Sequence, residues 1–195
     1  GPAHQRRNRR YPAFNSGSAQ SYVGFMLEHL KAHLTGKVII LGMGNPLRND
    51  DAAGSLLAQR IKDKVPFTVW DAGSSPENYL GRIIKENPDN LVIFDSADFG
   101  ACAGEYRVFD AEEVKTTNFF TTHNSSLALV INYLQSQIKT DIIILAIQPK
   151  AVIFGDKISP EMESALNKLE SWFCSAAKKG VGWKKIFIYL FRFYF

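Results

Sequence analysis

Apolar positions in the middle of the chain follow two alternating patterns. Short continuous runs rich in Val, Ile, Leu and Phe are typical of strands buried on both faces. Longer segments with apolar residues every three or four positions are typical of amphipathic helices. The strand-like runs are 37–42, 67–73, 90–98, 104–110 and 141–149. The helix-like segments are 51–64, 75–87, 124–137 and 159–173.

The alternation of buried strands with amphipathic helices predicts an α/β fold. Its sheet should be mostly parallel and covered on both faces. Segment 104–110 alternates polar and apolar residues more than the other runs, so we expect it at an edge of the sheet. Ligands of such sheets bind beyond the carboxyl ends of the strands, which is where we look for a site.

The two ends of the chain differ from this middle region. The first residues, GPAHQRRNRRYPAFNSGSAQ, are basic and polar, and Met26 is the first plausible start, so we predict that 1–25 is a non-native or disordered extension. We place one domain at 26–178. The tail 179–195 is rich in aromatic and basic residues and too short to span a bilayer, so no membrane contact and no role are assigned to it.

Charge and cysteine usage narrow the function classes. The formal net charge is +4, yet 36–177 holds 18 acidic against 13 basic residues. An acidic folded part argues against a nucleic-acid partner. The two cysteines, Cys102 and Cys174, form no CxxC pair, and no secretory signal precedes the domain. We therefore expect a cytoplasmic protein from a reducing compartment.

A glycine-rich turn, GMGNPLRNDDAAG at 42–54, follows the first predicted strand. Such turns often hold phosphate, and Asp71 falls where a ribose-binding acid would stand. The third glycine of the dinucleotide fingerprint is replaced by Leu47, however. Asp50 and Asp51 would also repel a pyrophosphate at the helix start. A dinucleotide-binding domain is therefore the less favoured alternative.

A metal site is the second possibility. Asp51, Asp95 and His123 follow strand or loop ends at one expected edge of the sheet. Two carboxylates and one imidazole suit a borderline divalent cation and leave coordination positions open. The residues alone leave simpler roles open for all three, as a helix cap, a turn cap and a hydrogen-bonded loop histidine.

Covalent catalysis is the third possibility. His123 lies near Ser125 and Ser126, but no GxSxG turn is present, and Cys102 has no motif neighbour. Nothing in the sequence supplies an identifiable base and a group to orient it, so this chemistry is disfavoured.

Five segments together resemble the [NiFe]-hydrogenase maturation endopeptidases. They are GMGNPLRNDDAAG, DAGSSPEN, IFDSADFG, FFTTHNSSL and LAIQP, and the similarity runs from about residue 37 to 172. It is greatest to the subfamily that serves formate hydrogenlyase-type hydrogenases. The resemblance implies a three-layer α/β/α sandwich. It also implies an endopeptidase that removes a C-terminal extension from the precursor of the hydrogenase large subunit after nickel insertion.

The family's metal-contacting residues map onto Asp51, Asp95 and His123, which we take as the catalytic and metal-binding residues. The nickel would be carried by the substrate, with zinc or another divalent cation able to occupy the site in vitro. The expected reaction is metal-assisted peptide hydrolysis, with Asp51 or Asp98 as general base. The alternative within the same fold is a non-catalytic nickel-sensing binder or chaperone.

A monomer is expected, with the hydrogenase precursor as its partner. One residue departs from the family pattern, because Ala52 stands where glycine is frequent. We expect a tighter turn there, which could displace Asp51.

Overall fold

The computed structural model describes residues 19–116, 120–121 and 124–191, with side chains described for 24–115 and 127–177. The strands are β1 (Val38–Met43), β2 (Thr68–Gly73), β3 (Asn90–Asp98), β4 (Tyr106–Asp110), β5 (Phe120–Thr121) and β6 (Asp141–Ile147). The helices are α1 (Ala19–Ala32), α2 (Ala53–Ile61), α3 (Leu80–Glu86), α4 (Ala111–Thr116), α5 (Asn124–Gln137) and α6 (Pro160–Phe191). Short 3₁₀ turns, η1 (Asn49–Ala52) and η2 (Pro76–Tyr79), precede α2 and α3.

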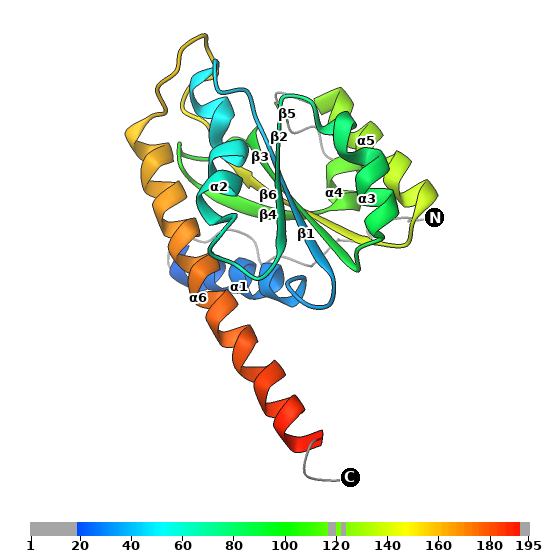
Figure 1. Ribbon diagram of the computed structural model, residues 1–195. Coiled ribbons are helices and arrows are strands. Elements are labelled where there is room, and N and C mark those ends of the chain that lie inside the picture. Colours follow the sequence, from blue (N-terminus) through cyan, green and yellow to red (C-terminus); the bar gives the residue numbers. More distant parts are fainter. Residues whose placement is uncertain (1–18, 117–119, 122–123, 192–195) are drawn as a thin grey trace, which may run out of the picture.

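The sheet has the strand order β2-β1-β3-β6-β4 (Figure 1). Strands β2, β1, β3 and β6 are parallel, and β4 pairs antiparallel with β6 at the edge. The edge position predicted for 104–110 is therefore confirmed. Short β5 pairs antiparallel with the end of β3, which extends the sheet beyond its carboxyl edge.

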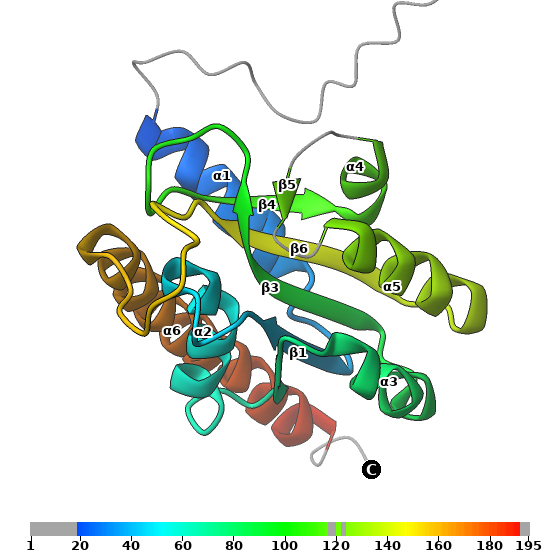
Figure 2. The ribbon, with the colours of Figure 1, turned by 90° about the horizontal axis from the view of Figure 1, so that it is seen from above.

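Helices cover both faces of the sheet, which confirms the α/β fold and the three layers. Figure 2 shows α2 and α6 on one side of the strands and α3 and α5 on the other. The side chains of each central strand alternate between the two faces of the sheet, so each strand contributes to the apolar cluster on both faces. In β1, Ile40 joins the cluster with α2 and α6, whereas Ile39 joins the cluster with α3 and α5. This double burial explains why the strands are continuously apolar.

Glycines bring α2 close to the sheet. A Cβ at Gly54 would lie 2.2 Å from the carbonyl oxygen of Phe94 and 2.5 Å from that of Met43. A Cβ at Gly42 would lie 2.4 Å from the Cβ of Ala58. The glycines of the first turn therefore seat a helix directly against β1 and β3, and this contact fixes where the acids of that turn point.

The outermost helices cross the predicted domain boundaries, which stay predictions. Helix α1 starts at Ala19 and buries Met26 and Leu30, of which Leu30 belongs to the cluster with α2 and α6. Helix α6 continues past residue 178 to Phe191 and projects away from the sheet (Figure 1). No helix in the described part of the chain is long and apolar enough to cross a membrane.

Candidate active site

The turn after β1 presents its two acids inside the protein. Asp50 and Asp51 lie in η1 and are each only 1% exposed. Gly44, with φ of +148°, lets the chain pass close to this turn, because a Cβ there would lie 2.1 Å from the carbonyl oxygen of Asp51. Ala52 has φ of −70° and ψ of −8°, which any residue adopts. Alanine is therefore unstrained at this position, and the displacement of Asp51 that a tighter turn could cause stays a prediction.

Asp50 braces two segments that lie far apart in the sequence. Its carboxylate accepts hydrogen bonds from the backbone N–H of Lys150 at 2.8 Å, the backbone N–H of Ser159 at 2.7 Å and the Ser159 hydroxyl at 2.8 Å. These bonds join the acid turn to segment 149–159. Asp50 thus has a structural role. Asp51 is the acid of this turn that we consider for catalysis.

Asp95 lies within β3 rather than after it, because the strand continues to Asp98. It is fully buried, and its Oδ1 accepts a hydrogen bond from the backbone N–H of Ser96 at 2.8 Å. The pKa of Asp95 is raised to about 8, chiefly because the carboxyl is buried; the Ser96 N–H lowers this pKa, and the nearby charge of Asp51 raises it. Asp51 and Asp95 therefore lie close enough for their charges to interact, and we call them the carboxylate pair.

His123, the third predicted ligand, lies outside the described residues. Its convergence with Asp51 and Asp95 stays a prediction. Within the described ranges, no group of three His, Cys, Asp or Glu side chains is arranged to hold a metal ion. The side chains of Ser125 and Ser126 also lie outside the described part.

Asp71 and Asp98 have other partners. Asp71 accepts hydrogen bonds from the Ser55 hydroxyl at 2.7 Å, the Gln59 amide at 2.7 Å and the Gly73 N–H at 3.0 Å, so it ties α2 to β2. These bonds give Asp71 a structural role and do not favour a ribose contact. The Gly100 N–H, together with the Gln148 amide, holds the pKa of Asp98 below its usual range. Asp98 is therefore a weaker candidate base than the sequence suggested.

Gln148 is a residue whose role the sequence analysis missed. It is buried, and its Oε1 accepts hydrogen bonds from the backbone N–H groups of Phe99 at 2.9 Å and Ala101 at 3.2 Å. Its amide nitrogen donates to Asp98 at 3.1 Å. The signal was available in LAIQP, because a glutamine that directly follows a run of buried apolar residues must find partners for its amide.

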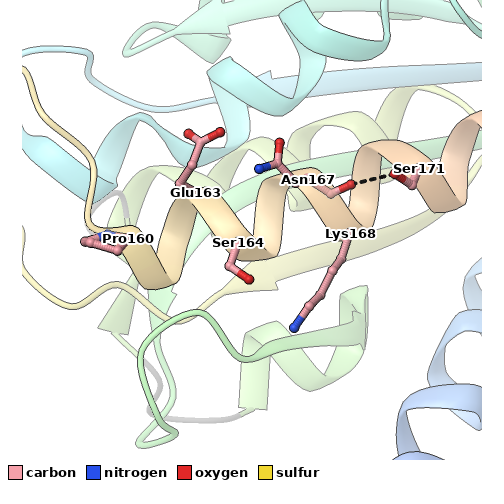
Figure 3. A pocket seen from close by; sticks show the side chains of 6 residues that line it. All are labelled: Pro160, Glu163, Ser164, Asn167, Lys168 and Ser171. Atoms are coloured by element: carbon pink, nitrogen blue, oxygen red, sulfur yellow. Dashed lines mark hydrogen bonds between the residues drawn. The ribbon is translucent and has the colours of Figure 1, made fainter.

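A surface hollow of about 700 Å³ runs along α6 (Figure 3). Figure 3 shows polar side chains of this helix around it, including Glu163, Asn167 and Lys168. Neither Asp51 nor Asp95 lines it. The exposed Cys102 and the partly buried Cys174 lie outside the carboxylate pair as well. The candidate chemistry is therefore at the carboxylate pair.

The fold and this pair define an α/β protein with a buried acidic site near the carboxyl edge of a parallel sheet. The sequence profile described as hydrogenase maturation protease matches residues 52–176. The hydrogenase 3 maturation protease of Escherichia coli (strain K12) is 37% identical over 143 residues, which cover 69% of this chain and 89% of that protein. The chain belongs to the hydrogenase maturation protease family, and the resemblance seen in the sequence is confirmed.

Solved structures agree with this assignment. The [NiFe] hydrogenase maturation protease HycI from Thermococcus kodakarensis KOD1 superposes with a TM-score of 0.69 at 30% identity, covering 77% of this chain and 99% of that one. The solution structure of the endopeptidase HycI from Escherichia coli gives a TM-score of 0.60 at 28% identity, covering 69% and 87%. The function of the chain is accordingly that of an endopeptidase in hydrogenase maturation.

Proposed function

We propose that this endopeptidase removes the C-terminal extension from the precursor of a [NiFe]-hydrogenase large subunit once nickel is in place. We further propose that Asp51, Asp95 and His123 form its catalytic, metal-contacting site. The observation that supports this best is the buried Asp51–Asp95 pair, in which the pKa of Asp95 is raised to about 8. Such coupled, perturbed carboxylates cluster at functional sites.

The donor set fits a divalent cation. Two ionised carboxylates buried together are costly, and a cation between them would offset the cost. Asp51 and Asp95 would hold it, with His123 as the third ligand. A cation bound there would polarise the scissile carbonyl or lower the pKa of a bound water.

The role of His123 as the third ligand follows from the family resemblance, since the residue lies outside the described part of the chain. On the described side of it, Thr121 pairs with Ala97, two residues beyond Asp95 along β3. Helix α5 begins at Asn124 and packs Leu127 into the cluster that also holds Ile93 and Ala97.

Asp51 is the better general base of the two acids considered. Asp98 is exposed, and its pKa is held down by Gly100 and Gln148, so it binds a proton weakly. Asp51 is buried beside Asp95 in the proposed metal-contacting site, where it would stand next to the attacking water. In the proposed step, Asp51 accepts a proton from the attacking water. The water oxygen bonds to the scissile carbonyl carbon, and Asp51 passes its proton to the departing nitrogen as the C–N bond breaks, which leaves a new carboxyl group and an amine.

The ligand set also supports the proposal that cleavage depends on nickel already bound to the precursor. Two oxygens and one nitrogen without a thiolate hold nickel less firmly than a closed site with four ligands would. Cys102 and Cys174 are free cysteines that do not belong to the proposed ligand set. An enzyme with so modest a site would depend on nickel that is already bound by its substrate, and its open positions would meet that ion.

The test compares one purified precursor prepared with and without nickel, with cleavage followed by intact-protein mass spectrometry. We expect the enzyme to trim only the nickel-loaded form. Asp51→Asn and His123→Ala should abolish cleavage and keep the fold. Asp71→Asn is the matched control and should keep substantial activity, because Asp71 lies on β2 and contacts Ser55 and Gln59.

Three results would count against this proposal. Equal trimming of both precursor forms would refute the dependence on nickel. Binding of the loaded precursor without cleavage would favour the nickel-sensing binder or chaperone. Saturable NAD(H) binding that Asp51→Lys strengthens would favour the dinucleotide alternative.

A further inference from the structure

Three large apolar side chains are exposed beside the acid turn. Leu47 is 57% exposed, Ile153 is 65% exposed and Phe154 is 86% exposed. Leu47 precedes η1, and the other two lie in segment 149–159. We call these three residues the apolar patch. Exposed apolar groups gathered in this way mark surfaces that bind a partner.

The two segments that carry the apolar patch are joined by backbone hydrogen bonds. The Gly155 N–H donates to the Leu47 carbonyl at 2.9 Å, and the Asn49 N–H donates to the Gly155 carbonyl at 2.8 Å. Arg48 and Gly155 form a short parallel bridge. The two segments meet at the top of the molecule in Figure 1. The apolar patch is thus one surface built from two distant parts of the chain.

Asp50 fixes the apolar patch relative to the carboxylate pair. Its three hydrogen bonds to Lys150 and Ser159 hold both ends of segment 149–159 against η1. Asp51 is the next residue in the same turn. The apolar patch is therefore held at a fixed place beside the turn that carries Asp51.

We propose that the apolar patch binds a large apolar side chain of the precursor, in an extended segment close to the bond that is cut. This rests on the endopeptidase function proposed above. Contact with such a side chain would remove Leu47 and Phe154 from water, which is favourable in proportion to the apolar area buried. The apolar patch would thereby contribute to the choice of substrate.

The size of the apolar patch favours a peptide over a second copy of this chain. Three side chains of this kind offer at most about 500 Å². A stable protein interface needs about 800 Å² from each partner. One or two side chains of an extended peptide match the smaller area.

The experiment measures steady-state cleavage of the nickel-loaded precursor by the full chain. We expect the double variant Leu47→Ser/Phe154→Ser to raise KM about tenfold with kcat unchanged, because the lost contact is made before and during the reaction alike. Phe154→Leu should restore most of the affinity. Leu129→Ser/Tyr133→Ser is the matched control and should leave KM unchanged, since these exposed residues (67% and 49%) lie on α5, on the other face of the sheet.

Binding of the same precursor, measured in parallel by calorimetry, separates the two proposals. Cleavage by all variants with unchanged KM would overturn the role of the apolar patch and leave the endopeptidase in place. If wild type binds without cleaving and the double variant binds about tenfold more weakly, the apolar patch stands and the proposed cleavage fails. A wild-type dimer in sedimentation that becomes a monomer in the double variant would make the apolar patch a self-association surface and overturn its role.

Discussion

Asp50 and Asp51 are adjacent and equally buried, yet their carboxylates have different partners and different roles. Asp50 accepts three hydrogen bonds from Lys150 and Ser159. Asp51 is coupled to Asp95. Consecutive residues of a 3₁₀ turn point about 120° apart, so one short turn supplies a brace and a reactive group together. This division explains why the turn carries two acids.

At Asp95 the raised pKa predicts a stability that falls as the pH rises. The pKa of this carboxyl is about 8 in the folded chain, against an ordinary value of 3.8. The folded state therefore keeps a proton that the unfolded state releases. The stabilisation is full below pH 4 and is lost as the pH rises through 8, by up to about 6 kcal/mol.

The measurement is urea unfolding in EDTA between pH 5 and 8.5. Wild type should lose stability over this range, and Asp95→Asn should remove most of the loss because it has no proton to release. Asp63→Asn, an exposed acid after α2, is the control and should follow wild type. Parallel curves for wild type and Asp95→Asn would contradict the prediction.

Among the elements, α2 depends on a glycine that helix propensity alone would disfavour. Alanine is preferred to glycine inside a helix by about 1 kcal/mol. A methyl group at Gly54 would nevertheless meet the carbonyl oxygens of Phe94 and Met43. We expect Gly54→Ala to destabilise the protein by about 2–3 kcal/mol, because α2 must move away from β1 and β3.

Gly81 is the matched control for Gly54. It lies in α3, and a Cβ there would have no neighbour within 4 Å. Gly81→Ala should therefore be neutral or stabilise by up to about 1 kcal/mol in the same thermal unfolding series. If both substitutions shift the melting temperature in the same direction, the close approach of α2 does not control its stability.

Elements with strong periodicity could be predicted from the sequence, and weakly patterned ones could not. The parallel strands are buried on both faces, so their runs are unmistakable. Helix α4 has only six residues, and among the residues of α1 with described side chains only Met26 and Leu30 are fully buried. Each offers too few apolar positions for a pattern.

At the site, the acidic residues could be picked out from the sequence, but which of them has a structural role could not. The hydrogen-bond partners of Asp50 lie 100 and 109 residues away in the sequence. Only the fold therefore shows which of the two acids accepts these structural hydrogen bonds. Asp71 likewise appeared as a candidate until its bonds to Ser55 and Gln59 were seen.

On the scale of the whole molecule, the contribution of the ends to stability can be tested by truncation. Met26 and Leu30 lie past residue 25, and the last buried apolar residue of α6 with a described side chain is Ala177. Deleting 1–25 and 181–195 should therefore change the melting temperature by no more than about 2 °C and leave cleavage intact.

A longer truncation provides the contrast. Deleting 1–32 removes Met26 and Leu30 from the core and should cost about 3–6 kcal/mol. Differential scanning calorimetry of both truncated proteins, compared with the full chain, measures the two losses of stability. A large loss in the shorter truncation, or none in the longer one, would show that the domain boundary lies elsewhere.

The brace at Asp50 has a consequence for engineering. Segments 44–52 and 149–159 are joined through one carboxylate and a short backbone bridge, although about a hundred residues separate them. Two of the three donors to Asp50 are backbone N–H groups, so a graft of only one segment keeps the brace only if the new backbone places them as this one does. A graft of both segments would carry the matched pair. We therefore expect substrate preference to transfer between relatives when both segments are exchanged together. Exchange of either segment alone should not transfer it.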